Sequence, residues 1–377
     1  MTKDPDVKDN IVVIESEIDD DISNDDLFNI NSWGADLSFR ELITMYDENE
    51  LEKPELQRKY VWDKMEASRF IESILLGLPV PSIFLAKTQD EKSLIVDGYQ
   101  RIMTIYDYVF GIFSKDDKVF KLSNSKRINE RWRNKAFKEL SESDQRKIRN
   151  KTIHAIIFEQ IHPSAGDTSL YQVFERINTS GRTLMPQEIR NCVYQGKLNT
   201  LLFELNRTTE WRKMYGDLEE DFRMRDLEMI LRFFALSSDD IKNRTAGQIS
   251  LKTYLNDFMG FKVSENQDFI EEKRVDFIKT VEFIYNSLGE NCFRNIDSDD
   301  KIINRFHPTI FDSIMIAFNF ARKNNFQLVN QNLNEVRLKL LKNNEYINST
   351  TIRTTNIDNI KKRISLALNY FFDRNYE

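Results

Sequence analysis

Cysteine and histidine are both scarce in this chain, which removes several kinds of site at once. The 377 residues include two cysteines, Cys192 and Cys292, and three histidines, His154, His162 and His307. The sequence therefore offers no CxxC pair and no disulfide framework. No HExxH motif is present either. Zinc sites and histidine-based nuclease sites are poorly supplied.

Glycine, proline and long apolar runs are also scarce. Gly 11 and Pro 7 are too few for a collagen-like, linker-like or turn-dense all-β chain. No apolar run approaches the ~18 residues of a transmembrane helix, and the N-terminus MTKDPDVKDN lacks the apolar stretch of a signal peptide. We therefore expect a cytoplasmic protein without a membrane partner. The 40% hydrophobic content suffices for a sizeable core, and the length suggests two or three domains.

Negative charge is concentrated at the N-terminus. Residues 1–30 hold ten acidic residues against Lys3 and Lys8, a net charge of −8. The whole chain carries −7, which leaves +1 for the remainder (−7 minus −8). We expect residues 1–30 to be an acidic, disordered tail that keeps the protein soluble. The alternative is an autoinhibitory strip that mimics nucleic acid and covers a basic groove.

The rest of the chain divides into two patterns. Residues 31–165 mix helical and strand periodicity, and residues 166–377 show apolar residues at helical spacing almost throughout. The predicted fold class is α+β, with an N-terminal α+β domain followed by an all-α domain. Capping boxes and end signals set the expected elements: helices from Ser38, from Asp63 to Gly77, from Tyr99 or Gln100 to Gly111, and from Pro186, with strands over 82–86, 93–98 and 152–161.

The best candidate site is the junction Ile95-Val96-Asp97-Gly98-Tyr99-Gln100-Arg101. A buried strand ends in Asp-Gly and a helix begins at once, so the free N–H groups of the helix favour an anion near Gly98. Arg101 adds a fork that can grip phosphate, Asp97 can hold a metal ion, and Gln100 can orient a water. No GxxxxGK[ST] motif is present. A tight strand–helix turn with a surface arginine is the alternative.

Two further segments have the composition of binding sites. In residues 57–62, QRKYVW, two cations and a glutamine precede an aromatic pair. One interpretation is that Arg58 contacts a phosphate. The alternative is an amphipathic edge strand. In 174–181, FERINTSG, a helix ends in a polar loop whose Asn178 and Gly181 tolerate left-handed backbone. One interpretation is that the N–H groups of this loop form an anion-binding nest. The alternative is a helix C-cap followed by a polar loop.

Residues 115–151 form a basic segment, with thirteen Lys and Arg against six acidic residues. It reads either as a solvated helical insertion or as a DNA-binding surface on which an aromatic ring stacks on an unpaired base. The candidate DNA-binding residues are Lys126, Arg127, Arg131, Trp132, Arg133 and Lys135.

These motifs, in this order, resemble the N-terminal domain family of GmrSD-type restriction systems, a ParB/sulfiredoxin-like group. The family pattern has QRxYVW, IESILLGxPIPxIFL and a strand ending in DGQQR. Much later come FxRINTxGxxLxxxEIRN and RxxDxExxLRFxAL. The matching residues here are 57–62, 71–81, 97–101, 174–191 and 225–233.

The resemblance implies binding of a purine nucleoside triphosphate with Mg²⁺ or another divalent cation, in a system that restricts foreign DNA. By position it implicates Asp97, Gln100 and Arg101 in catalysis, with Asp97 on the metal. The implied nucleotide-binding residues are Gln57, Arg58, Gly98, Tyr99, Asn178, Thr179 and Gly181.

Two departures from the family pattern leave the activity open. Tyr99 stands where the family usually has glutamine, so hydrolysis is in question while binding is not; the ring could instead stack on the base. Many relatives carry a histidine-rich HNH-type nuclease domain; with only His307 in the last 200 residues of this sequence, we expect none here. The alternatives are therefore a nucleotide- or DNA-sensing module that acts with a partner nuclease or methyltransferase, and a ParB-like DNA nuclease. Oligomerisation is left open.

Overall fold

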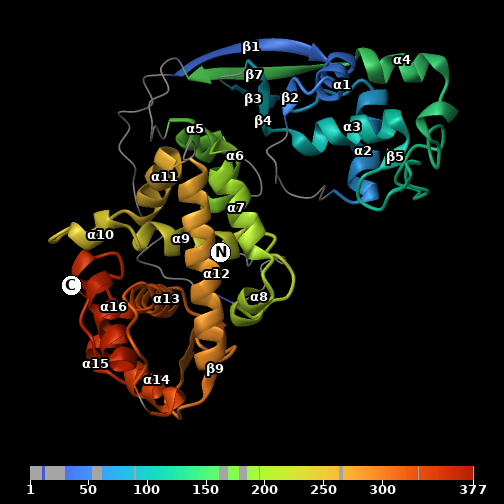
Figure 1. Cartoon of the computed structure of the whole chain (residues 1–377). Helices are drawn as coiled ribbons and strands as arrows, with labels where there is room; N and C mark the ends of the chain where they lie inside the picture. The colour runs from blue at the N-terminus through green and yellow to red at the C-terminus, as the bar shows by residue number, and fades with distance from the viewer. Residues whose placement is uncertain are drawn as a thin grey trace.

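The computed structural model of the chain (Figure 1) has two parts with different architecture. It describes residues 11–12, 30–52, 62–88, 91–160, 169–177, 185–194, 196–262, 266–329 and 331–376. The first part is a sheet with helices, and the second is almost wholly helical. The chain is thus mixed α and β, as predicted.

A five-stranded sheet organises the first part, in the order β1-β7-β3-β4-β2. The pairs β1/β7 and β3/β4 are antiparallel, and the pairs β3/β7 and β2/β4 are parallel. The strands are β1 (Ile30–Ser38), β2 (Leu51–Glu52), β3 (Ile83–Lys87), β4 (Ser93–Asp97) and β7 (Thr152–Gln160). The other elements of this part are α1 (Phe39–Asp47), α2 (Lys64–Leu75), α3 (Tyr99–Phe110), β5 (Ile112–Phe113), β6 (Lys118–Val119), the 3₁₀ helix Phe137–Glu139 and α4 (Glu142–Asn150).

The helix starts follow from local chemistry that the sequence already indicates. At Ser38 the side chain accepts the Glu41 N–H, and the Glu41 carboxylate accepts the Ser38 N–H at 2.6 Å. Asp63 and Glu66 form the same capping box before α2. Gly111 ends α3 in the left-handed conformation, and Pro186 opens its helix at the first turn. These predicted boundaries are confirmed.

Alternate residues of the central strands enter two different cores. Leu85 and Ile95 pack with the helices α1–α3 on one face of the sheet, whereas Val96 and Phe158 pack on the other face into the core of the helical part. The ring of Phe158 meets that of Phe174 edge to face at 6.4 Å. Because both faces are covered, β3 and β4 read as nearly continuous apolar runs.

The helical part packs around α9 and α13, whose side chains are almost all buried. Its helices are α5 (Ser169–Ile177), α6 (Pro186–Val193), α7 (Lys197–Asn206), α8 (Thr209–Tyr215), α9 (Arg225–Leu236), α10 (Asp239–Asn243), α11 (Leu251–Lys262), α12 (Gln267–Leu288), α13 (Pro308–Lys323), α14 (Leu333–Leu341), α15 (Asn344–Thr351) and α16 (Ile357–Phe372). A hairpin of β8 (Arg294–Ile296) and β9 (Ile302–Phe306) precedes α13. Within the described part of the chain, no helix has the length and apolarity to cross a membrane.

A short piece of the acidic N-terminal segment is part of this second core. Ile11 is buried there and forms a parallel bridge with Phe306, and the Val12 N–H donates to the Phe306 carbonyl at 2.8 Å. At these two residues the expectation of a disordered tail is wrong, because a buried isoleucine and a backbone hydrogen bond fix the chain. The remainder of residues 1–29 lies outside the described ranges.

Candidate functional site

The junction between β4 and α3 needs a glycine for two independent reasons. Gly98 has φ of 103°, a left-handed conformation that side chains disfavour. A Cβ at this position would also lie 2.3 Å from Cγ2 of Ile83. The backbone of Gly98 therefore packs directly on β3, and α3 starts at Tyr99 as predicted.

Asp97 and Arg101 face each other across this turn. Arg101 Nη1 donates to the Ser82 carbonyl at 2.8 Å, and Nη1 and Nη2 both lie 3.4 Å from Asp97 Oδ2. The side chain of Arg101 is 19% exposed and that of Asp97 is 38% exposed. The contact to Ser82 is short, whereas the contacts to the carboxylate are long and weak. Arg101 thus holds the residue before β3, and the Asp97 carboxylate beside it stays partly exposed.

Gln100 connects this junction to the QRKYVW segment. Its Oε1 accepts the backbone N–H of Trp62 at 3.3 Å, and the Trp62 ring meets Phe70 of α2 at 5.5 Å. Two segments that lie almost 40 residues apart in sequence therefore meet at the first turn of α3. Gln57 and Arg58 lie outside the described residues.

Tyr99 packs against the core of the sheet-containing part. Its ring is partly buried against that core, and burial, with the nearby charges of Tyr46 and Asp107, raises the pKa of Tyr99 to about 12. The phenol therefore stays protonated at neutral pH. In this position part of the ring serves packing, and its stacking on a base stays a prediction.

Asp97 is the predicted ligand of a divalent cation. Among the described residues, no group of three or more His, Cys, Asp or Glu side chains could hold a metal ion. Mg²⁺ needs no such group, because it is commonly bound through one or two carboxylates together with substrate phosphates. A single, partly exposed Asp97 is compatible with that mode of binding.

In the basic segment the predicted role of Trp132 needs correction. Trp132 is 4% exposed, and its Nε1–H donates to Asp144 Oδ2 at 3.2 Å. A ring held in the core has no face for a base. Burial raises the pKa of Asp144, but hydrogen bonds from Trp132 and Ser141 and the charge of Arg131 bring it below its ordinary value. This buried carboxylate was not singled out from the sequence, because its partners lie twelve and thirteen residues upstream.

The other residues of this predicted surface differ in exposure. Lys126, Arg127 and Arg131 are exposed, although Arg131 also pairs with Asp144 at 3.1 Å. Arg133 and Lys135 are half-buried. The guanidinium of Arg133 donates to the Ile128 carbonyl at 2.9 Å, which ties it to its own loop. Of the six predicted DNA-binding residues, the exposed cations are therefore Lys126, Arg127 and Arg131.

The later motifs fall on buried ion pairs. Arg190 of α6 pairs with Glu228 of α9 at 2.8 Å, and Arg232 pairs with Asp312 at 2.6 Å. Glu188 is 3.2 Å from Arg223. These residues join α6, α9 and α13, so their chemistry is structural. Asn178, Thr179 and Gly181 of the preceding loop lie outside the described residues.

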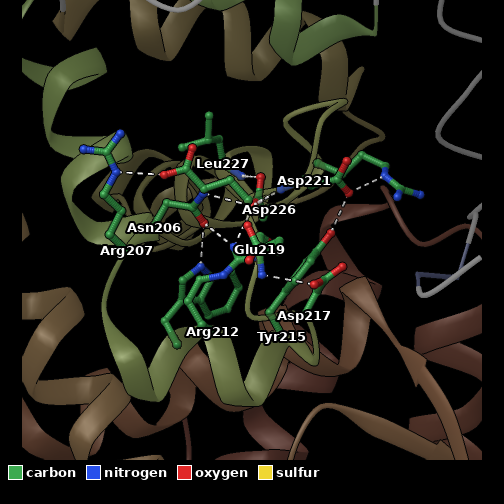
Figure 2. A network of polar contacts seen from close by, with 12 residues as sticks. Asn206, Arg207, Arg212, Tyr215, Asp217, Glu219, Asp221, Asp226 and Leu227 are labelled. Carbon is green, nitrogen blue, oxygen red and sulfur yellow. Dashed lines mark hydrogen bonds and ion pairs between the residues drawn. The ribbon is translucent and has the colours of Figure 1, made fainter. Parts of the chain in front are cut away.

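A further polar network, around Asp226, was not predicted from the sequence (Figure 2). Its carboxylate accepts from Arg212 Nη1 at 2.6 Å, from Asn206 at 2.9 Å and from the backbone N–H of Asp221 at 2.8 Å. Burial raises the pKa of Asp226 above its ordinary value, and these donors oppose that rise. The signal in the sequence was the Arg225-Asp226 pair at a helix start, but its partners on α7 and α8 are visible only in the fold.

The comparisons with known proteins agree with the motifs. Residues 39–195 match the family model described as the GmrSD restriction endonuclease, N-terminal domain. This match confirms the predicted resemblance: residues 39–195 are similar to the N-terminal domain of that restriction endonuclease. It spans α1 to α6, including the β4–α3 junction. No curated protein and no solved structure matches the chain.

Proposed function

We propose that this chain is the nucleotide-binding component of a GmrSD-type restriction system, with its site at the β4–α3 junction. One observation carries the proposal: the Trp62 N–H donates to the Gln100 side chain. That bond brings the end of the QRKYVW segment to the DGYQR segment. Gln57 and Arg58 stand only a few residues before Trp62 in sequence, and we propose them as nucleotide-binding residues. We further propose a ParB/sulfiredoxin-like fold for residues 31–165.

The ligand would be a purine nucleoside triphosphate with Mg²⁺. A guanidinium has five N–H donors, so Arg101 can keep the short contact to Ser82 while a phosphate replaces the two long contacts to Asp97. Asp97 would then be available to hold the metal, which would neutralise phosphate charge. The start of α3 adds backbone N–H groups and a positive helix dipole. Asn178, Thr179 and Gly181 are proposed as a second source of phosphate contacts.

A second candidate function is nucleotide sensing without rapid turnover, with DNA cut by a partner nuclease. The tyrosine at position 99 favours this function, because no glutamine stands there to orient an attacking water. In either case we propose that DNA meets the exposed cations Lys126, Arg127 and Arg131 of the basic segment.

Calorimetry with ATP and GTP, with and without Mg²⁺, tests the site. Arg101→Ala removes a charge-assisted contact, so affinity should fall by about 1.5–3 kcal/mol. Asp97→Asn should abolish the difference between titrations with and without Mg²⁺. Arg101→Lys, which keeps the charge and loses the fork, should fall between wild type and Arg101→Ala.

The control is Arg146→Ala, because Arg146 is an exposed arginine on α4. It should bind nucleotide like the wild type. Melting temperatures of all variants separate impaired binding from impaired folding, since Arg101 also supports the start of β3. Equal affinity in wild type, Asp97→Asn and Arg101→Ala would remove the junction from the nucleotide site.

A further inference from the structure

A β-bulge at the end of β4 places Asp97 on the face of the sheet that carries Phe84. Phe84 of β3 pairs with Asp97, and the next residue, Leu85, pairs with Ile95. Val96 is therefore an extra residue, and it opposes Phe84 together with Asp97. Bulges of this kind re-aim a side chain and are common beside active sites. Because residues that oppose each other share a face, the Asp97 carboxylate lies on the same side of the sheet as Phe84.

A row of four paired residues crosses the sheet from this bulge to β1. Phe84 pairs with Ile156 of β7, and Ile156 pairs with Gly34 of β1. The row Asp97, Phe84, Ile156 and Gly34 spans three strand spacings, about 14 Å. Phe84 and Ile156 are half-buried and Gly34 is exposed, so solvent reaches this largely apolar row. A nucleoside triphosphate that lies along the row with its phosphates at Asp97 has its base near Gly34.

His154 of β7 lies at the Gly34 end of the row. Its Nδ1 is 2.9 Å from Asp36 Oδ1, and the two side chains are 51% and 71% exposed. A carboxylate only accepts hydrogen bonds, so Nδ1 donates its N–H to Asp36 and Nε2 of the neutral ring is an acceptor. Within the described part of the chain, Nε2 has no hydrogen-bond partner. The pair therefore presents an oriented and unused acceptor.

The glycine at position 34 makes room for this ring. A Cβ there would lie 2.8 Å from Cε1 and 3.0 Å from Nε2 of His154. The imidazole therefore lies over the backbone of β1 instead of standing away from the sheet. Its Nε2 is thus beside the end of the row, where it can accept an N–H from the edge of a bound base.

We propose that His154 binds the base of the nucleotide by accepting a hydrogen bond at Nε2 from an N–H donor on the purine edge, and that Asp36 positions the His154 ring. Adenine offers its exocyclic amino group as the donor, and guanine offers an amino group and a ring N–H. The inference rests on the proposed nucleotide site, because phosphates held at Arg101 and Asp97 set the position of the base. It adds a specificity-determining residue at the other end of the same ligand.

Calorimetry with ATP, GTP, purine riboside triphosphate and inorganic tripolyphosphate, all with Mg²⁺, tests the role of His154. Purine riboside triphosphate keeps the ring system but lacks the N–H donors. The wild type should therefore bind either ATP or GTP about 3- to 10-fold more tightly than this analogue, and the preferred nucleotide identifies the base. His154→Ala should abolish the preference and leave tripolyphosphate affinity unchanged. Equal affinity of the wild type for all three nucleotides would overturn the proposal.

Further variants separate the hydrogen bond from a general disturbance of β7. Gly34→Ala displaces the His154 ring without removing a functional group, so it should also reduce the preference. Asp36→Ala should reduce it too, whereas Asp36→Asn, which keeps an oxygen to accept from Nδ1, should retain most of it. Glu159→Gln is the control, because Glu159 is exposed on the same strand but on the opposite face. Melting temperatures show that each variant is folded.

The outcomes distinguish this inference from the proposed function. A preference that persists in His154→Ala, while Arg101→Ala loses affinity, would overturn the role of His154 and leave the nucleotide site at the junction. If the wild type binds neither the nucleotides nor tripolyphosphate, the proposed nucleotide site is wrong and the base contact is wrong with it.

Discussion

The two parts of this chain use arginine in opposite ways. At the β4–α3 junction, Arg101 is partly exposed and makes long contacts to Asp97 that a ligand can replace. In the helical part, Arg190 and Arg232 are almost fully buried and make short contacts to carboxylates. Both sets lie in motifs that resemble the same family. A motif arginine therefore indicates a binding site only where the fold leaves its guanidinium within reach of a ligand.

The difference has an energetic origin. A buried ion pair gains little over an apolar pair but is costly to break, because the surviving charge is left in a medium of low polarity. An exposed pair costs little to break, since water replaces the partner. The helical part should consequently tolerate few changes at its motif residues, whereas the junction should lose binding before it loses stability.

The largest effect should come from breaking the Asp226 network in Figure 2. Asp226→Asn leaves Arg212 buried without a counter-charge, so the free energy of unfolding should fall by about 3–5 kcal/mol. Chemical denaturation measures it. Arg207→Ala is the control, because Arg207 pairs with Glu220 at the surface; it should cost less than about 1 kcal/mol. A similar loss in the free energy of unfolding for the two variants would contradict the proposed difference between buried and exposed ion pairs.

A pH dependence should follow from His307 in the same part. Burial lowers the pKa of His307 from 6.5 to about 4, so the unfolded chain binds a proton more readily between these values. Stability from this residue is complete above pH 6.5 and is lost as the pH falls from 6.5 to 4, by about 3 kcal/mol in all. Unfolding curves of wild type and His307→Gln should converge in this range. His154→Gln, an exposed control, should keep the wild-type slope.

Charge reversal in the basic segment tests the exposed charges of the sheet-containing part. Lys126→Glu with Arg127→Glu changes two exposed cations, so the slope of log affinity for duplex DNA against log salt should flatten by about 0.9 for each phosphate that these cations no longer neutralise. Fluorescence anisotropy at several salt concentrations measures the slope. Trp132→Phe, which loses the bond to Asp144, should lower stability and leave the slope unchanged. A wild-type slope in the double variant would place the DNA surface elsewhere.

Local signals in the sequence predicted much of this fold. The capping boxes at Ser38 and Asp63 fixed helix starts because their partners are three residues away, and Gly98 stood out because strand and helix meet there. The sequence could not reveal that Trp132 is buried, since that depends on Asp144 from a later helix. Nor could it show that Arg101 holds the Ser82 carbonyl or that Ile11 reaches Phe306, because these contacts depend on packing of distant segments. Pattern locates elements and motifs, and tertiary contacts decide what each motif residue can touch.

The smallest effect concerns Tyr99, a residue of the junction motif whose ring packs against a core. If the proposed site turns over nucleotide slowly because a tyrosine replaces the water-orienting glutamine, Tyr99→Gln should raise single-turnover phosphate release roughly tenfold, or ~1.4 kcal/mol of barrier. Nucleotide affinity should change by less than about 1 kcal/mol, because the proposed phosphate contacts come from Arg101 and backbone N–H groups, whereas the partly buried Tyr99 ring packs against the core. Tyr99→Phe keeps the packing and removes a hydroxyl whose pKa is about 12, so it should release phosphate at the wild-type rate. Slower release in either variant would show that Tyr99 takes part in the chemistry, and the contrast between a ligand-facing junction and a core-facing tyrosine would no longer hold.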